Sequence, residues 1–459
     1  MSGNRRNKVL AVLFVGVLMG ALDIAIIGPA LPAIQAEFGL DPRQLPWIFT
    51  SYVLFQMIST PLMAKLSDFF GRRSIYVLDV ALFAAGSLVV ALSHGSGLWV
   101  LLLAGRAIQG FGAGGIFPVA SAVIGDTFPA EERGRALGLI GAVFGLAFLL
   151  GPVLGGLLLG FGWQWLFLLN LPIALVVMIA GWRLLPHDRL VDSPKFDYAG
   201  MAVLGVALAT FTFALNEFDP SQPGTSFARP EVWLALLVSI LAWVLLVRIE
   251  LRAEHPVFPV RLFANRQLVV AFTITAGAGL GEAATVFLPL LAVLSLGVSS
   301  STGSYLLLAL VGAMAVGSPV AGRLVDRFGS RSVILTGLAL MAAGMIGISQ
   351  FSQSMIWFIT FSALIGLGLS ALLGAPIRYI TLNETTAEDR SASQGMVTTF
   401  TSIGQIVAAA LIGSLAASFG DSTSGYDLSF LGIGLVALAL IVVGLLLKKQ
   451  AVEQTTRAS

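Results

Sequence analysis

The chain has 459 residues, 57% of them hydrophobic and only 11% charged, and its 26 basic residues nearly balance its 24 acidic ones, which leaves a net charge of +2. No soluble domain can bury that much apolar surface, because soluble proteins average roughly 45–50% apolar residues even with glycine included. The composition therefore excludes a soluble enzyme, a disordered chain and a nucleic-acid-binding protein, and it indicates an all-α protein that crosses a membrane many times.

Fourteen hydrophobic segments are long enough to cross a membrane, which takes about 20 residues for roughly 30 Å of hydrocarbon. We expect a transmembrane helix at each of 9–32, 46–66, 74–92, 98–124, 135–159, 164–185, 197–216, 230–251, 267–296, 302–324, 331–350, 354–380, 391–418 and 427–447.

The positions of the basic residues orient these helices. With a cytoplasmic N-terminus, the inner segments hold 22 of the 26 basic residues and the outer segments hold only Arg43 and Arg229. Cytoplasmic loops of membrane proteins carry such an excess. We therefore expect a multi-pass protein of the cell inner (cytoplasmic) membrane with both termini in the cytoplasm. The first segment contains Asp23 and lacks a small-residue cleavage site, so it is expected to stay as a helix rather than act as a signal peptide.

The sequence contains an internal repeat. AKLSDFFGRRS at 64–74 matches GRLVDRFGSRS at 322–332 with an offset of 258 residues, and AEERGRALG at 130–138 matches AEDRSASQG at 387–395 with an offset of 257. These matches indicate that the first six and last six helices are copies, which is the architecture of transporters that work by alternating access. The predicted domains are an N-terminal six-helix bundle at 1–190, two inserted transmembrane helices at 191–260 and a C-terminal six-helix bundle at 261–459.

The first pair of matching loops combines basic residues, an acid and a glycine. Glycine permits a tight reversal, and the acid can accept hydrogen bonds from an arginine or a helix N-terminus. We predict a cytoplasmic gate that holds the halves together in one state and releases them in another; the alternative is that these charges only set the topology. The gate residues are Lys65, Asp68, Gly71, Arg72 and Arg73 in the first copy and Asp326, Arg327, Gly329 and Arg331 in the second.

Two opposite charges lie inside predicted spans of the first half. At 1.5 Å per residue, Asp23 is ~22 Å from the inner end of its helix and Arg106 is ~18 Å from the inner face of the membrane core, so they are expected to pair. A charge at this depth costs at least ~2.5–3.5 kcal/mol, which indicates a partner or a function. We predict a proton-coupling pair in which Asp23 takes up and releases a proton while Arg106 stays charged; a permanent salt bridge is the alternative.

Glu282 is the predicted counterpart of Asp23 in the second half. It follows Asp23 by 259 residues and lies at a similar depth, ~22 Å, with no basic residue of that half beside it. An unpaired carboxyl group here could bind a proton for coupling or neutralise a cationic substrate. It could also stay neutral and hydrogen-bonded in a packed interface.

The segment 135–159 presents a face of small residues. Small residues let helices approach closely, and proline bends a helix, so this segment is predicted either to flex during transport or simply to pack tightly. The residues are Gly145, Gly151, Pro152, Gly155 and Gly156.

Polar side chains are scarce on the helices expected to surround a central cavity. A sugar carrier would need many converging hydrogen-bonding groups, whereas an apolar cavity with one or two acids suits amphiphilic organic cations and, as the runner-up, lipids. The predicted substrate-binding residues are Gln56, Gln109, Phe111, Glu282, Phe287 and Gln394.

Other functions have no support in the sequence. The chain contains no G-x-x-x-x-G-K-[ST] loop for ATP, and its three histidines, His94, His187 and His255, fall in separate loops, so neither a metal site nor a catalytic dyad is expected. We therefore expect a transporter rather than an enzyme, driven by an ion gradient instead of ATP and without a cofactor. Its expected partners are small lipophilic molecules or lipids, protons and the lipid bilayer, with no nucleic acid, and we expect a monomer.

Three stretches resemble motifs of one known family. The 64–74 loop resembles the A motif of the major facilitator superfamily, G-x-L-x-D-x-x-G-R-R/K, with Ala64 in place of the first glycine, which is present in the second copy as Gly322. RAIQGFGAGG (106–115) resembles motif B of that family, and GPVLGG (151–156) resembles its antiporter motif C.

Two further stretches, LDIAIIGPALP (22–32) and WQWLFLLNLP (163–172), are similar to segments of the fourteen-helix drug:proton antiporter branch of this family. The resemblance covers essentially the whole chain. It implies the major facilitator fold and proton-driven export of lipophilic, often cationic compounds.

Overall fold

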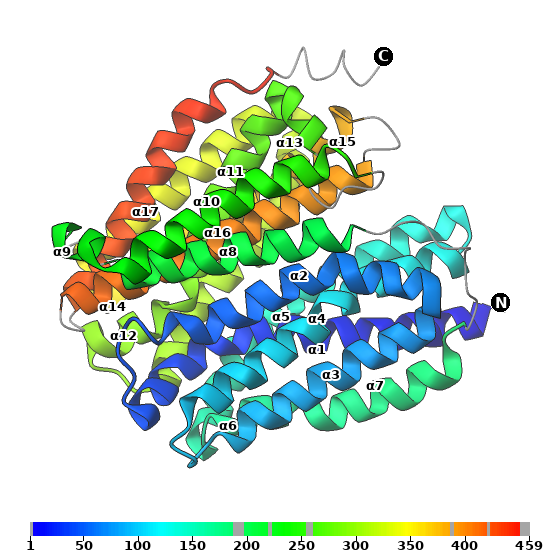
Figure 1. Ribbon diagram of the computed structural model, residues 1–459, viewed down its shortest axis with the longest axis horizontal. Helices are drawn as coiled ribbons and strands as arrows, with labels where there is room; N and C mark the ends of the chain where they lie inside the picture. Colours follow the sequence, from blue (N-terminus) through cyan, green and yellow to red (C-terminus); the bar gives the residue numbers. More distant parts are fainter. Residues whose placement is uncertain are drawn as a thin grey trace.

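The computed structural model of the chain describes residues 3–186, 197–218, 223–253, 260–385, 390–419 and 423–449. In this part of the chain all regular structure is helical, as expected for apolar segments that must satisfy their backbone hydrogen bonds internally. Figure 1 shows a blue-to-cyan group of helices and a yellow-to-red group, with the green helices α8 (Tyr198–Glu217) and α10 (Pro230–Glu250) running alongside.

The first group contains seven helices and one short 3₁₀ turn. They are α1 (Gly3–Phe38), α2 (Pro46–Phe70), α3 (Arg72–Leu92), α4 (Trp99–Thr127), α5 (Ala130–Leu158), η1 (Leu159–Phe161), α6 (Gln164–Leu168) and α7 (Asn170–Leu184).

The second group is entered through α9 (Pro223–Ala228), which precedes α10, and through η2 (Val260–Ala264). It contains α11 (Arg266–Val286), α12 (Leu288–Leu296), α13 (Ser300–Phe351), α14 (Met355–Leu372), α15 (Ala375–Asn383), α16 (Arg390–Ser418) and α17 (Thr423–Gly444). The long α13 consists of two helices that meet at a kink.

Thirteen helical segments of the described chain are long and apolar enough to cross a membrane, and each of them overlaps a segment predicted from hydropathy. Helix α5 also coincides with a predicted span, but its described apolar part, Gly145–Phe161, is shorter than the others. The protein is therefore an all-helical multi-pass membrane protein, and the predicted fourteenth span stays a prediction.

Successive long helices run in opposite directions, which gives the bundle two ends. We call the end that carries the start of α1 and the finish of α17 the terminal end, and the other the opposite end. At the terminal end, Gly71 turns the chain between α2 and α3 with φ 90°, and Gly329, 258 residues later, turns it inside α13 with φ 76°. A side chain would strain the backbone at both positions, so the repeat found in the sequence is also a repeat in backbone geometry.

Packing inside the two groups repeats at the same offset. An ideal Cβ on Gly86 of α3 would lie 2.4 Å from the backbone nitrogen of Gln109 in α4. One on Gly344 of α13, 258 residues later, would lie 2.8 Å from the backbone nitrogen of Ile365 in α14. The helices touch backbone to backbone at both crossings, which only glycine allows.

The two groups meet along a seam. Helix α1 packs against α12, α5 against α13, and α2 against α16, while α8 packs against both α2 and α16. Close contacts across the seam lie toward the opposite end. There, an ideal Cβ on Gly28 would lie 2.8 Å from the carbonyl oxygen of Val286, and one on Gly413 would lie 2.3 Å from the ring of Pro46.

Candidate functional site

Asp23 of α1 and Arg106 of α4 form a fully buried ion pair, as their depths predict. Oδ2 of Asp23 accepts a hydrogen bond from Nη1 of Arg106 at 2.5 Å, and neither side chain is exposed. Nη1 of Arg106 also donates to Oε1 of Gln109 at 2.7 Å, and its Nε donates to the carbonyl oxygen of Ile48 in α2 at 3.0 Å.

Two amide side chains hold the second carboxylate oxygen of Asp23. Nε2 of Gln109 donates to Oδ1 at 2.6 Å, and Nδ2 of Asn170 in α7 donates to it at 3.2 Å. Both amides also contact Oγ of Ser87 in α3, at 2.8 and 3.2 Å. We call Asp23, Ser87, Arg106, Gln109 and Asn170 the Asp23 cluster; it ties α1, α3, α4 and α7 together.

The surroundings of Arg106 can support its charge beyond the ion pair. Its guanidinium group lies 4.3 Å from the ring centre of Tyr52 and 5.9 Å from that of Phe167. Aromatic faces attract a cation most strongly where water is excluded. The rings, together with the carbonyl oxygen of Ile48, therefore give Arg106 partners that remain when Asp23 becomes neutral.

A separate cavity lies between the two groups of helices and holds about 480 Å³ of free space, its opening included. Its wall is mainly aliphatic, with Phe148 of α5 as an aromatic contributor. Among its described lining residues Glu282 of α11 is the single charged one, and Thr285 adds a hydroxyl group. Gln405 of α16 is placed to hydrogen-bond with Glu282. The chemistry of this lining therefore matches an apolar molecule that carries one positive charge.

The predicted correspondence between Glu282 and Asp23 is wrong by one residue. The repeat offset of 258 pairs Asp23 with Gly281, and both face into their own group: Asp23 is fully buried, and an ideal Cβ on Gly281 would lie 2.4 Å from Sδ of Met341. The same offset pairs Ile24 with Glu282, and both line the cavity. One residue turns a helix by about 100°, so an offset of 259 joins two different faces.

The small residues of α5 lie on the seam near the opposite end. The carbonyl oxygen of Pro152 accepts a hydrogen bond from Oγ of Ser304 in α13 at 2.8 Å. An ideal Cβ on Gly155 would lie 2.6 Å from the same Oγ, and one on Gly156 would lie 2.3 Å from the ring of Tyr305. These contacts hold α5 against α13 at the opposite end.

The other two glycines of this face differ from each other. An ideal Cβ on Gly151 would lie 2.5 Å from the side chain of Ala25, so Gly151 belongs to the α1–α5 contact. Among the described residues, no atom lies within 4 Å of an ideal Cβ on Gly145. The structure therefore brings four of the five predicted residues to close contacts and leaves Gly145 in open space.

The charged residues of the first gate copy pair within their own group. Arg72 forms an ion pair with Asp68 at 2.6 Å and with Asp126, at the end of α4, at 3.0 Å. The guanidinium group of Arg73 lies 4.7 Å from the ring centre of Trp182 in α7, and Lys65 is half-buried one turn before Asp68. The recorded contacts of Arg72 and Arg73 therefore do not bridge the two groups in this state.

The second gate copy has a different set of partners. Arg327 lies 5.2 Å over the ring of Phe328, Gly329 forms the turn and Arg331 is half-buried. The side chain of Asp326 lies outside the described residues.

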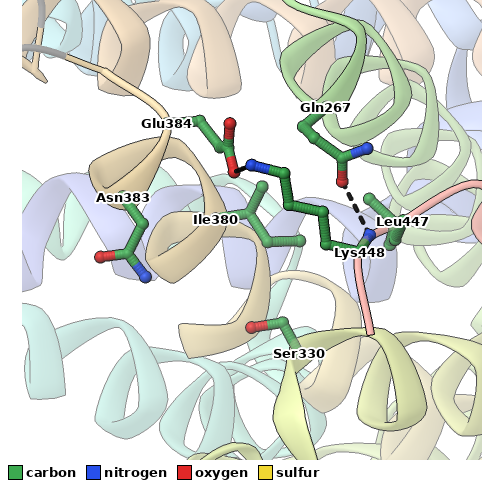
Figure 2. Close-up of a pocket in the computed structure, with 7 residues that line it drawn as sticks. All are labelled: Gln267, Ser330, Ile380, Asn383, Glu384, Leu447 and Lys448. Carbon is green, nitrogen blue, oxygen red and sulfur yellow. Dashed lines mark hydrogen bonds and ion pairs between the residues drawn. The ribbon is translucent and has the colours of Figure 1, made fainter. Parts of the chain in front are cut away.

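Ser330 stands where the first copy has Arg72, yet an acid remains beside it. Glu384 follows α15, and its Oε1 accepts from Nζ of Lys448 at 2.5 Å, while the backbone N–H of Lys448 donates to Oε1 of Gln267 at 2.9 Å. Figure 2 shows Lys448 pointing toward Glu384, with Ser330 on the same small pocket. The positive charge thus comes from the segment after α17 instead of from the loop.

Of the six predicted substrate-binding residues, only Glu282 belongs to the described residues that line the cavity. Gln109 belongs to the Asp23 cluster, Phe287 is fully buried at the break between α11 and α12, and Gln394 donates to Oγ1 of Thr381 near the terminal end. Phe111 packs against the core, and Gln56 is half-buried on α2. These predictions rested on residue type, which does not say which face of a helix a side chain occupies.

Sequence reasoning missed several residues of both sites. Phe148 lines the cavity, and its spacing of four residues from Pro152 could have identified it, because both then share one face of α5. Asn170 and Ser87 complete the Asp23 cluster. The signal for Asn170 was a lone amide in an apolar stretch, whereas Ser87 carried no signal.

Comparisons with known proteins agree with this architecture. The Major Facilitator Superfamily model matches residues 13–315 and, a second time, residues 267–458. The uncharacterized MFS-type transporter YfiU of Bacillus subtilis (strain 168) is 32% identical over 431 residues, which cover 91% of this chain and 80% of that protein. The multidrug transporter protein MdtP of the same organism is 28% identical over 420 residues, covering 90% and 75%. The xylose transporter XylE from E. coli, in a partially occluded inward open conformation, has a similar fold, with a TM-score of 0.66 at 14% identity and coverage of 97% and 98%.

Proposed function

This chain belongs to the major facilitator superfamily and is a secondary transporter rather than an enzyme, and we propose that it exports lipophilic cations across the cell inner membrane in exchange for protons. One observation carries the proposal: among the described lining residues, Glu282 is the single acid in a mainly apolar cavity on the seam between two repeated groups of helices. An apolar wall favours a lipophilic molecule, and an acid without a basic partner favours a cation or a proton. The multidrug transporter MdtP, at 28% identity, is consistent with such a substrate.

The proposal includes the finer architecture that the sequence predicts. We assign the chain to the fourteen-helix drug:proton antiporter branch, with bundles at 1–190 and 261–459, an inserted pair at 191–260 and both termini in the cytoplasm. Helix α8 supports an inserted role for the pair, because it packs on the α2 and α16 seam from outside the cavity. With this orientation the terminal end is cytoplasmic, and the opposite end faces outward.

In the proposed cycle, Glu282 alternates between a cation and a proton. A lipophilic cation enters from the cytoplasm and places its charge beside Glu282 and its apolar part against Phe148 and the aliphatic wall. When the α5–α13 seam opens, a proton from outside binds Glu282 and the cation leaves. When the transporter opens again to the cytoplasm, the neutral carboxyl group of Glu282 releases its proton there. Exchange of the proton for the cation at one site couples the two fluxes.

The Asp23 cluster is proposed as the second coupling element. None of its residues is among the described lining residues of the cavity, and Asp23 lies about 100° around α1 from Ile24, so the cluster is not placed to contact the substrate directly. Protonation of Asp23 would weaken its bond with Arg106 and loosen the contacts of α1 with α4 and α7. Since α1 also lines the cavity, this change reaches the substrate site through one helix.

Purified protein in liposomes provides the test. Ethidium uptake driven by a pH gradient is expected in the wild type, and Glu282→Gln is expected to reduce it at least about tenfold, because loss of the charge–charge contact costs about 1.4 kcal/mol or more. Thr285→Val is the matched control, since it alters the same cavity without removing its charge. Ethidium transport that persists in Glu282→Gln, or wild-type protein that moves a fluorescent phospholipid and no cation, would show the proposal to be wrong.

A further inference from the structure

Asp79 is a second buried acid of the first group, and the mechanism above does not use it. It lies on α3, seven residues after Arg72 and hence ~10 Å from the terminal end of that helix. Its side chain is fully buried, and neither carboxyl oxygen has a hydrogen-bond partner among the described residues.

A recess in α4 accommodates this carboxyl group. An ideal Cβ on Gly115 would lie 2.0 Å from Oδ2 and 2.5 Å from Oδ1 of Asp79, and one on Gly112 would lie 2.5 Å from the backbone oxygen of Asp79. Any larger residue at 115 would occupy the place of the carboxyl group. The two helices are thus fitted around an acid rather than around an apolar side chain.

No positive charge compensates Asp79 among the residues that the structure describes. Helix α3 packs against α2, α4, α6 and α7, so the basic residues of these helices are the candidate partners of Asp79. Arg106 of α4 is engaged with Asp23, and Arg72 is engaged with Asp68 and Asp126.

The remaining charged groups on these helices do not supply a partner. Lys65 of α2, Arg73 of α3 and Arg183 in the last turn of α7 form no described hydrogen bond with Asp79. Tyr76 lies one turn earlier on α3. Its hydroxyl group is also buried without a hydrogen-bond partner among the described residues.

An ionised carboxylate cannot be held in such a place at low cost. Burial of an unpaired charge costs several kcal/mol, and a group so placed becomes neutral instead. We therefore expect the carboxyl group of Asp79 to be protonated in the state described here. Opening of the α3–α4 contact, or entry of water into the recess, would let it release that proton.

We propose that Asp79 is a second proton-binding site, separate from the Asp23 cluster, which takes up a proton when α3 and α4 close on the Gly115 recess and releases it when they part during the transport cycle. The site is distinct because Ser87, the cluster's residue on α3, is eight residues and ~12 Å further along the helix. The inference rests on the proposed proton-coupled export, to which it adds a proton that never meets the substrate.

Infrared spectroscopy of the full-length protein in detergent tests the proton itself, independently of transport. We expect a carbonyl band of a protonated carboxylic acid at neutral pH that Asp79→Asn removes and that Glu282→Gln leaves in place. Gly115→Ala should shift or abolish the band, because its methyl group would displace the carboxyl group. Gly125→Ala on the same helix, where no atom of the described residues lies within 4 Å of the ideal Cβ, is the matched control and should not change it.

The count of protons exchanged per ethidium in liposomes tests the cycle. Asp79→Asn is expected to lower this ratio while leaving ethidium binding unchanged within about twofold. A band that survives both Asp79→Asn and Gly115→Ala would overturn proton binding, and an unchanged ratio after loss of the band would overturn proton exchange. Wild-type protein that moves no cation would refute the proposed export instead, and the infrared result would still decide whether Asp79 holds a proton.

Discussion

The two groups of helices share a backbone plan but differ in what they bury. In the first group, the side chain of Asp23 in α1 is buried among arginine, amide and hydroxyl groups. In the second, the corresponding Gly281 packs against Met341 and Leu369, which are apolar. The second group instead directs its acid, Glu282, into the cavity. A duplicated frame can therefore hold its acids in two different ways, in a buried ion pair in one copy and on the wall of a cavity in the other.

The largest effect is expected from breaking the polar core of the first group. Arg106→Leu leaves Asp23 buried without its partner, and removal of one member of a buried ion pair costs about 3–5 kcal/mol. Thermal unfolding of the purified protein in detergent measures this loss.

The double variant Asp23→Leu with Arg106→Leu sharpens the comparison, because it makes the first core resemble the apolar second one. Apolar replacement of a whole buried pair is often neutral, so the double variant should regain most of the stability lost by Arg106→Leu while gradient-driven ethidium transport stays absent. If the single variant unfolds at the wild-type temperature, the ion pair does not stabilise the first group.

A smaller effect is expected at the seam where the groups meet. In Gly156→Ala the new methyl group would lie 2.3 Å from the Tyr305 ring, and overpacking of this kind costs about 1–3 kcal/mol. The cost falls on the state in which α5 and α13 are in contact at the opposite end, so the open state should gain population by about fivefold or more.

The chain's lack of cysteine makes this measurable without background. A single cysteine at Ser304 should react faster with a membrane-impermeant maleimide when Gly156→Ala is present. Gly145→Ala serves as the control, because Gly145 lies on the same helix and no described atom lies within 4 Å of its ideal Cβ. Equal labelling rates in both variants would mean that the α5–α13 contact does not control access.

The sequence predicted the positions of the helices better than it predicted the residues of the two sites. Hydropathy located the helices because a membrane span has a minimum length, and depth arithmetic paired Asp23 with Arg106 because a helix rises uniformly. Which face each residue occupies was harder to predict. Glu282 was aligned one residue away from its true register, and Gln109 was expected in the cavity although it packs behind it. Hydrophobic periodicity is weak in helices that are apolar on every side, so packing rather than pattern sets the rotation.

The smallest effect is expected at the terminal end, where both groups keep an acid but use different cations. Arg72 binds Asp126 and Asp68 with only 12% of its side chain exposed, whereas Lys448 binds Glu384 with 30% exposed. Partly exposed ion pairs contribute up to about 1 kcal/mol. Lys448→Ala should therefore lower the unfolding temperature less than Arg72→Ala does.

Adding Ser330→Arg to Lys448→Ala tests whether the two cations are equivalent. The new arginine would stand at the position of Arg72 in the repeat, on the same pocket as Glu384, and could replace the missing lysine. We expect it to restore the unfolding temperature, and we expect no such gain when Glu384→Gln is also present, because the arginine then has no acid to bind. A gain that persists without Glu384 would show that Ser330→Arg stabilises the protein by another contact, and that Lys448 is not the functional replacement for the arginine of the first copy.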